Sequence, residues 1–120
     1  MKNEWNTHYI SSQNIDKISR GKAKVVKKYL LQFQQLIPPK IKLLREGLAK
    51  EDRHAVRQIL HNISPQLQFF DVPDVVPSIK QIASSYQSMP WSDIEEMGEE
   101  IMNILENAAR EVDQVLRTRF

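Results

Sequence analysis

The chain has 120 residues, 41% of them hydrophobic, and a formal net charge of +2 at pH 7, which together suit a single domain with one core. It has no cysteine, which excludes a disulfide framework, a thiol nucleophile and a cysteine-based metal site. No apolar run approaches the ~20 residues of a membrane span, and the N-terminus lacks the apolar region of a signal peptide. We therefore expect a cytoplasmic protein that does not enter a membrane.

Positive and negative charges are divided unevenly along the chain. Residues 1–60 carry thirteen Lys and Arg against five Asp and Glu, whereas residues 61–120 carry four against ten. This asymmetry indicates either a basic docking face or two halves that attract each other within one fold. The simplest interpretation of the cluster Lys22, Lys24, Lys27 and Lys28 is a solvated helix face. Nucleic acid is not an expected partner, because the lysines are not interleaved with exposed aromatic residues and no reader motif is present.

The first thirteen residues differ in pattern from the rest of the chain. Residues 1–13 are predicted to form an irregular lead-in, and residues 14–120 to form one helical domain. Trp5, Tyr9 and Ile10 are large side chains of the lead-in, and we expect them to pack over one end of that domain.

A short helix and a long helix are predicted next. Residues 14–20 can make two helical turns, which Gly21 is placed to stop because glycine readily adopts the left-handed conformation found after many helices. Residues 22–50 keep one apolar stripe in phase, although Pro38 and Pro39 remove two amide donors from the middle of it. The continuous stripe predicts one kinked helix rather than two separate helices.

Two further helices follow, over residues 52–70 and from residue 75 to about residue 88. Acidic residues suit the positive N-terminal end of the first. Asp71 and Asp74 are candidate N-terminal caps of the second, and Pro77 falls in its first turn, where a missing amide costs little.

The last predicted helix begins at a capping box, with Ser92 as the N-cap and Glu95 three residues later. With only three glycines and few strand-like alternations, the sequence argues against β structure. Four main amphipathic helices joined by short loops predict an all-α fold: an antiparallel up-down four-helix bundle with a short N-terminal helix.

One exposed histidine lies in the middle of the helix predicted over residues 52–70. The apolar residues of this helix recur at three- and four-residue spacing, from Val56 through Ile63 to Phe70, and so share one face. At 100° per residue, His61 falls about 140° from the centre of that face and points to solvent.

The neighbours of His61 on the outward side are Arg57, Ser64, Pro65 and Gln68. Pro65 lies inside the helix, where proline costs about 3 kcal/mol, and it leaves the carbonyl of His61 without an amide partner. This exposed imidazole at a strained point of a helix is the main candidate site of the chain.

Signatures of several enzyme classes are missing from the sequence. There is no glycine-rich phosphate loop, no GxSxG elbow and no HExxH pair. His54 and His61 are seven residues apart rather than four, so no metal site is expected. No carboxylate pair indicates general acid–base chemistry. His61 is left as the nucleophile candidate, suited to a reaction whose catalytic groups arrive on a partner.

With these features the chain resembles the histidine-containing phosphotransfer (HPt) domains, helical bundles that relay a phosphoryl group between receiver-domain aspartates. The resemblance covers nearly the whole chain. It rests on residues that fall where these domains place their N-terminal segment, core and acceptor histidine: Tyr9, Ile10, Ile15, Ile18, Ser19, Phe33, Leu44, Gly47, Asp52, Val56, Leu60, His61, Ile63 and Phe70.

The acceptor motif itself matches in part. His61, the apolar Ile63 and the apolar Leu67 agree with the family pattern. The sequence departs from it where Ser64 replaces a lysine, Pro65 replaces a glycine and Asp71 replaces the closing glycine.

The resemblance implies a phosphocarrier rather than an enzyme, with His61 as the phosphoacceptor. The implied partner is the receiver domain of a response regulator or of a hybrid histidine kinase. That partner supplies the Mg²⁺ and lysine that neutralise charge in the transition state, so no cofactor is expected on this chain. Arg57 is the nearest cation on the same helix. Pairing of the next helix about Asp71 and Val72 places residues beside His61 or within a turn of it, namely Lys80, Gln81, Ala83 and Ser84.

Three interpretations remain open. The first is a phosphorelay intermediate. The second is an adaptor with the HPt fold that binds a receiver without carrying phosphate, which the loss of lysine at Ser64 permits. The third, which the missing reader motif disfavours for nucleic acid, is an unrelated helical bundle that binds acidic partners or nucleic acid through its basic first half.

Overall fold

The computed structural model describes residues 5–70, 72 and 75–120. Within this part of the chain α-helices are the only regular secondary structure and there is no strand, as predicted. None of the helices in the described residues is both long and apolar enough to cross a membrane. The helices are α1 (Gln13–Ser19), α2 (Ala23–Ala49), α3 (Arg53–Phe69), α4 (Val76–Ser85) and α5 (Trp91–Arg119).

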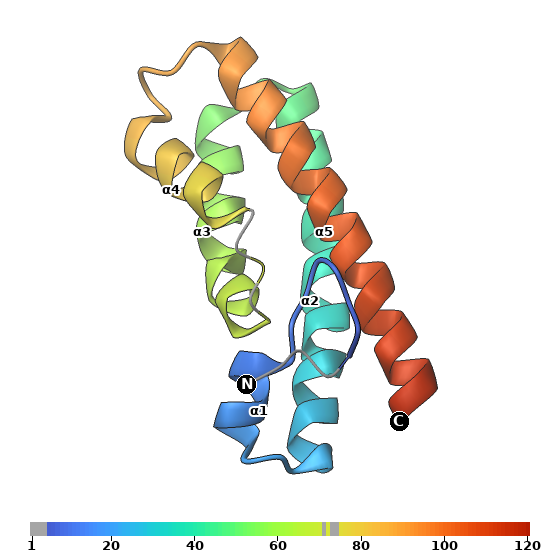
Figure 1. Ribbon diagram of the computed structural model, residues 1–120. Helices are drawn as coiled ribbons and strands as arrows, with labels where there is room; N and C mark the ends of the chain where they lie inside the picture. The colour runs from blue at the N-terminus through green and yellow to red at the C-terminus, as the bar shows by residue number, and fades with distance from the viewer. Residues whose placement is uncertain (1–4, 71, 73–74) are drawn as a thin grey trace.

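The two longest helices set the shape of the molecule. α2 and α5 pack against each other and run along the longest dimension, within overall extents of 44 × 23 × 19 Å (Figure 1). α3 packs against α2 and α4, and α4 also contacts α5. The α2–α3 connection and the start of α5 lie at one end of the molecule, whereas α1 and the C-terminus lie at the other.

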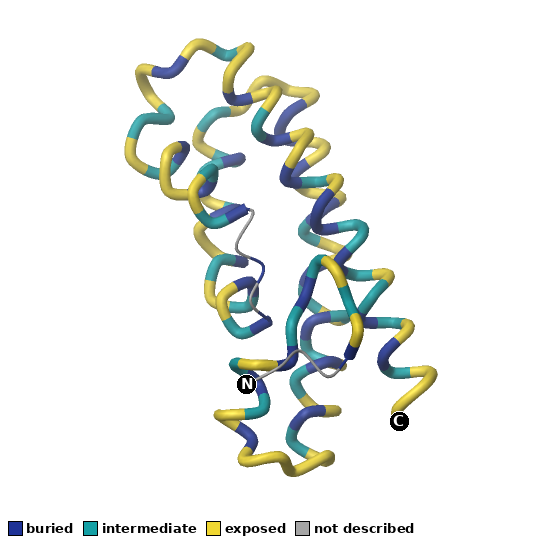
Figure 2. Tube along the Cα trace, in the orientation of Figure 1, coloured by how far each residue is buried: buried dark blue, intermediate teal, exposed yellow. Residues whose placement is uncertain are grey.

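A single hydrophobic core runs between the helices. Buried positions recur along each helix at intervals of three or four residues, so each helix turns one stripe inward (Figure 2). Phe33 of α2 and Phe70 at the end of α3 are fully buried, and their rings meet edge to face with centroids 5.2 Å apart. Aromatic pairs favour this geometry. The apolar stripes predicted for α2 and α3 face the core, with Leu36 and Ile59 half-buried at its edge.

α2 continues without a break through Pro38 and Pro39, as predicted. Both proline rings are exposed, while Ile41 and Leu44 beyond them are buried, so one stripe faces one core along the whole helix. Because the prolines lie on the solvent side, water can reach the carbonyl groups that lose their helical amide donors.

Glycine allows close approach where α2 meets α5. A Cβ atom at Gly98 of α5 would lie 2.9 Å from both Cδ atoms of Leu48 of α2. Both positions are buried, so the absence of a side chain at Gly98 brings these helices together near the end of α2.

The helix ends agree with the sequence in part. Asp52 caps α3, its side chain accepting a hydrogen bond of 3.0 Å from the Ala55 amide. α1 stops one residue earlier than predicted, with Arg20 and Gly21 both left-handed at φ 54° and φ 72°. Pro77 lies in the first turn of α4, as expected, whereas the candidate caps Asp71 and Asp74 lie outside the described residues.

The predicted capping box of the last helix is wrong. α5 begins two residues earlier, at Trp91, with Pro90 instead of Ser92 as the N-cap and no side-chain cap. The Pro90 carbonyl accepts hydrogen bonds from the amides of Asp93 (3.0 Å) and Ile94 (3.3 Å). The first helical hydrogen bonds therefore start at Pro90, and Ser92 already lies inside the helix. The carboxylate of Glu95 accepts from the Trp91 indole N–H instead, at 3.2 Å.

The described part of the lead-in packs onto the helical part of the molecule, as predicted. Trp5 and Ile10 are buried and Tyr9 is half-buried. The carboxylate of Glu111 on α5 accepts three backbone amides, from His8 and Tyr9 at 2.6 Å and from Ile10 at 3.0 Å. This single side chain fixes three successive residues of the lead-in against α5.

Candidate functional site

His61 is exposed in the middle of α3. Leu60 and Ile63 on either side of it are 1% and 0% exposed, so the back of this turn is fixed in the core while the imidazole stands in solvent. The sequence prediction for the orientation of His61 is therefore confirmed.

The flanking residues leave open space around the imidazole. Asn62, Pro65 and Gln68 are exposed and Ser64 is half-buried. α3 continues through Pro65 as far as Phe69, with Leu67 fully buried beyond the proline. Because proline has no amide hydrogen, the helix passes this point without a donor for the His61 carbonyl.

Arg57, one turn before His61, is half-buried and lies against α4. Its guanidinium carbon is 5.7 Å from the centroid of the Tyr86 ring, within the range of a cation–π contact. One guanidinium nitrogen also donates to the Gln58 side chain at 3.4 Å, and its Nε is buried without a hydrogen-bond partner. The positive charge of Arg57 is thus held at the C-terminal end of α4.

A second basic residue, Arg53, also joins α3 to the end of α4, and no sequence pattern indicated this contact. The guanidinium of Arg53 donates to the backbone carbonyls of Tyr86, at 2.9 Å, and of Met89. The ring of His54 lies with its centroid 6.3 Å from that of Tyr86. Arg53 therefore satisfies carbonyl groups that follow α4, and it ties the beginning of α3 to the α4–α5 connection.

The end of α3 is also held from outside the helix. The Ser11 amide donates to the Phe70 carbonyl at 2.9 Å, and the Asn14 side chain donates to the Gln68 carbonyl at 3.2 Å. Carbonyl groups in the last turn of a helix lack the amide donor four residues later that the helix supplies elsewhere. The helix that carries His61 is thus fixed at both ends.

α4 lies alongside α3 and is anchored by the buried Ile79 and Ile82. The residues predicted to neighbour His61 divide by exposure: Lys80, Gln81 and Ser84 are exposed, and Ala83 is half-buried. The Ser84 hydroxyl donates to the Gln81 carbonyl at 3.2 Å. Their placement beside His61 stays a prediction.

No cluster of metal-ligating side chains accompanies this histidine. Over residues 5–70, 72 and 75–120, no three His, Asp or Glu side chains are grouped so that they could hold a metal ion. Comparisons of the chain with known protein families, with curated proteins and with solved structures found no match.

Proposed function

We propose that this chain is a phosphorelay intermediate of two-component signal transduction, in which His61 accepts a phosphoryl group from a receiver-domain aspartate and passes it on. The exposure of His61 between the buried Leu60 and Ile63 is the observation that carries the proposal. A nucleophile on a helix anchored from behind is held in a fixed direction for a partner to approach.

The proposed fold is an antiparallel up-down four-helix bundle with α1 as a short N-terminal helix. Its support is the order of helix contacts, in which α2 meets α3, α3 meets α4, α4 meets α5 and α5 meets α2. Four helices that contact one another in chain order and close a ring are typical of such bundles.

The contacts at the α3–α4 junction support the predicted neighbours of His61. Arg57 lies over Tyr86, and Arg53, one turn earlier on α3, also reaches the carbonyl of Met89, later in the chain. Moving toward the C-terminus of α3 therefore corresponds to moving toward the N-terminus of α4. One turn from Arg57 to His61 corresponds to one turn from Tyr86 to Ile82, which is flanked by Gln81 and Ala83.

The chemistry needs little from this chain beyond an accessible imidazole. The lone pair of the imidazole Nε2 forms the P–N bond while the P–O bond to the aspartate breaks, and the aspartate leaves as a carboxylate. The remaining proton of the imidazolium passes to solvent, which reaches the exposed His61 directly. Positioning and charge neutralisation come from the Mg²⁺ and lysine of the receiver, so the chain acts as a carrier without a cofactor of its own. The proposed setting is the cytoplasm.

An adaptor that binds a receiver without being phosphorylated is the second candidate. Two observations favour it: Ser64 stands in place of the lysine of the HPt motif, and the guanidinium of Arg57 is engaged by Tyr86. Neither residue therefore provides a free cation beside a phosphoryl group on His61.

The two candidates differ in where phosphate is found after mixing. The chain is incubated with a panel of phosphorylated receivers, and both binding and transfer of label are measured. A relay acquires an acid-labile label while the receiver loses it. An adaptor forms a complex with at least one receiver but stays unlabelled. A chain that neither binds nor accepts label from any receiver contradicts both candidates.

A further inference from the structure

A basic patch lies on the first turns of α2. Lys24, Lys27, Lys28 and Leu31 are all exposed, and they line one shallow depression together with Gln32 and Gln35. Leu31 is 43% exposed, whereas the preceding Leu30 is fully buried, so the outer face of the helix presents an apolar side chain among the three lysines. No Asp or Glu occurs from residue 17 to residue 45, a stretch with nine Lys and Arg.

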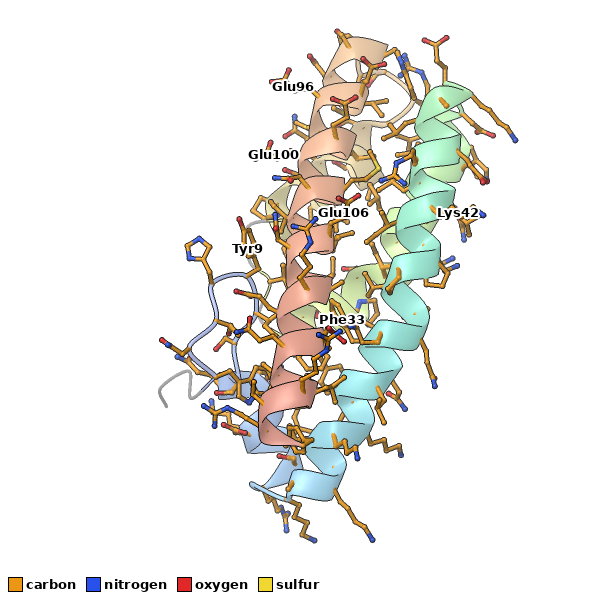
Figure 3. All side chains as sticks on the ribbon, turned by 90° about the vertical axis from the view of Figure 1, so that its right-hand side faces the viewer. Tyr9, Phe33, Lys42, Glu96, Glu100 and Glu106 are labelled. Carbon is orange, nitrogen blue, oxygen red and sulfur yellow. The ribbon has the colours of Figure 1, made fainter. Side chains whose placement is uncertain are left out.

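An acidic patch of opposite character lies on the first turns of α5. It consists of Asp93, Glu96, Glu99 and Glu100, all of them exposed. No Lys or Arg occurs from residue 89 to residue 103. In Figure 3, Glu96 and Glu100 project from α5 on the side away from α2.

The two patches are not neutralised by each other within one molecule. In the described residues the side-chain ion pairs are Arg45–Glu106 at 2.6 Å and Arg117–Asp113 at 2.9 Å, and neither involves a patch residue. α2 begins at the end of the molecule that holds α1, whereas α5 begins at the opposite end (Figure 1). The uneven charge of the sequence therefore appears on the surface as two separate patches and is not cancelled inside the fold.

The like charges within each patch repel one another. Lys24 and Lys28, like Glu96 and Glu100, are four residues apart, a spacing at which like charges destabilise a helix. An opposite charge brought by another molecule relieves that repulsion. The patches also match in length, since residues 24–31 and residues 93–100 each cover seven steps of 1.5 Å, about 11 Å.

We propose that copies of this chain associate head to tail through these surfaces, the basic patch of one copy binding the acidic patch of the next. The acidic patch faces away from α2, which carries the basic patch, and the two patches lie at opposite ends of the molecule, so each contact uses two different surfaces and leaves one patch of each kind for a further copy. Leu31 supplies apolar contact one turn beyond Lys27 and Lys28. The net charge of +2 is small enough that the long-range repulsion between copies is weak. This inference is independent of the proposed phosphotransfer.

Paired charge reversals test the proposal by sedimentation equilibrium at low and high salt. The basic-patch variant is Lys24→Glu with Lys28→Glu, and the acidic-patch variant is Glu96→Lys with Glu100→Lys. The control, Lys50→Glu with Lys80→Glu, changes exposed lysines outside the patches. The control and the basic-patch variant both lower the net charge from +2 by 4, to −2. Circular dichroism establishes that each variant keeps its helical content.

The expected result is association of the wild-type chain at about 20 mM salt, seen as an average mass that rises with protein concentration, and its loss near 0.5 M, where the Debye length falls to a few ångströms. Each patch variant weakens this association about tenfold or more, and the control does not. An equimolar mixture of the two patch variants regains association, because both contacts are then complementary again, and it associates more tightly than a mixture of the control with the acidic-patch variant.

Three results would overturn the proposal. The wild-type chain stays monomeric at low salt, the control weakens association as much as the basic-patch variant, or the mixture of patch variants fails to associate. A monomeric wild-type chain that binds anionic vesicles or nucleic acid through Lys24 and Lys28 would assign the basic patch to a different polyanion.

Discussion

Ser64 is the residue at which this chain departs most from the HPt motif on which the proposed function rests. It is half-buried one turn after His61, at the position where the HPt motif carries a lysine. A serine hydroxyl offers one neutral hydrogen bond, worth about 1 kcal/mol or less, whereas a lysine offers a charge-assisted contact worth roughly 1.5–3 kcal/mol when partly shielded. The difference decides how well a phosphoryl group on His61 is stabilised.

Ser64→Lys is expected to shift the equilibrium between a phosphorylated receiver and phosphorylated His61 toward the histidine by about tenfold, because 1.4 kcal/mol corresponds to one decade. The measurement is the distribution of label at equilibrium after each variant is mixed with one receiver. Gln68→Lys is the matched control, since it adds the same charge about 10.5 Å along the helix from His61, about 6 Å further than Ser64. If the distribution is unchanged in Ser64→Lys, another cation such as Lys80 already stabilises the phosphoryl group.

Residue-level prediction succeeded where periodicity decides the outcome. Spacing alone placed His61 on the solvent side of α3, because once the buried stripe is known, the position of a residue in the helix determines the direction of its side chain. It did not foresee that Arg57 lies over Tyr86 or that Arg53 caps the end of α4. Those contacts join residues about thirty positions apart, and their partners depend on how the helices pack.

At the scale of elements, the apolar stripes predicted each helix to within about three residues. The prediction of one helix through Pro38 and Pro39 is confirmed because core packing on the opposite face outweighs the lost hydrogen bonds. The start of α5 was predicted two residues late. Two start signals, Pro90 and Ser92, lie two residues apart there, and sequence alone does not rank them.

In the lead-in, burial was predictable from the sequence but the contact partner was not. Its large side chains were expected to pack over the domain, and Trp5 and Ile10 do so. No sequence pattern indicated that Glu111, about a hundred residues later, receives three of its amides. A lone half-buried glutamate on the amphipathic α5 carries no signal that separates it from its exposed neighbours.

Glu111→Gln is expected to destabilise the fold by roughly 1.5–3 kcal/mol, because an amide keeps one acceptor oxygen and turns its NH₂ group toward backbone donors. Urea denaturation measures the free energy of unfolding. Trp5 fluorescence, in a Trp91→Phe background that removes the other tryptophan, should shift to the red as the lead-in loosens.

Asp113→Asn is the matched control for this prediction. It makes the same change of carboxylate to amide on α5, at a residue whose ion pair with Arg117 is exposed and contributes little. Equal stability losses for Glu111→Gln and Asp113→Asn, with no change in Trp5 emission, would show that Glu111 does not hold the lead-in.

At the scale of the whole molecule, the order of helix contacts follows from short connections between consecutive amphipathic helices, which is why the all-α class was predictable. The position of the unevenly distributed charges in the folded protein was not predictable. The sequence left open whether its two halves attract each other within the fold, and the described residues contain one ion pair between the halves, Arg45–Glu106. The remaining charge stays on the surface, where it is available to a partner.

The most direct test of the central claim compares the three histidines of the chain, using a receiver that transfers label to the wild-type protein. His8→Gln, His54→Gln and His61→Gln are mixed separately with that phosphorylated receiver, and label on the chain is measured. Because His61 is exposed, its substitution should leave the fold intact, which circular dichroism checks. Label is expected on the His8 and His54 variants and absent from His61→Gln. Undiminished label on His61→Gln would contradict the assignment of His61 as the phosphoacceptor.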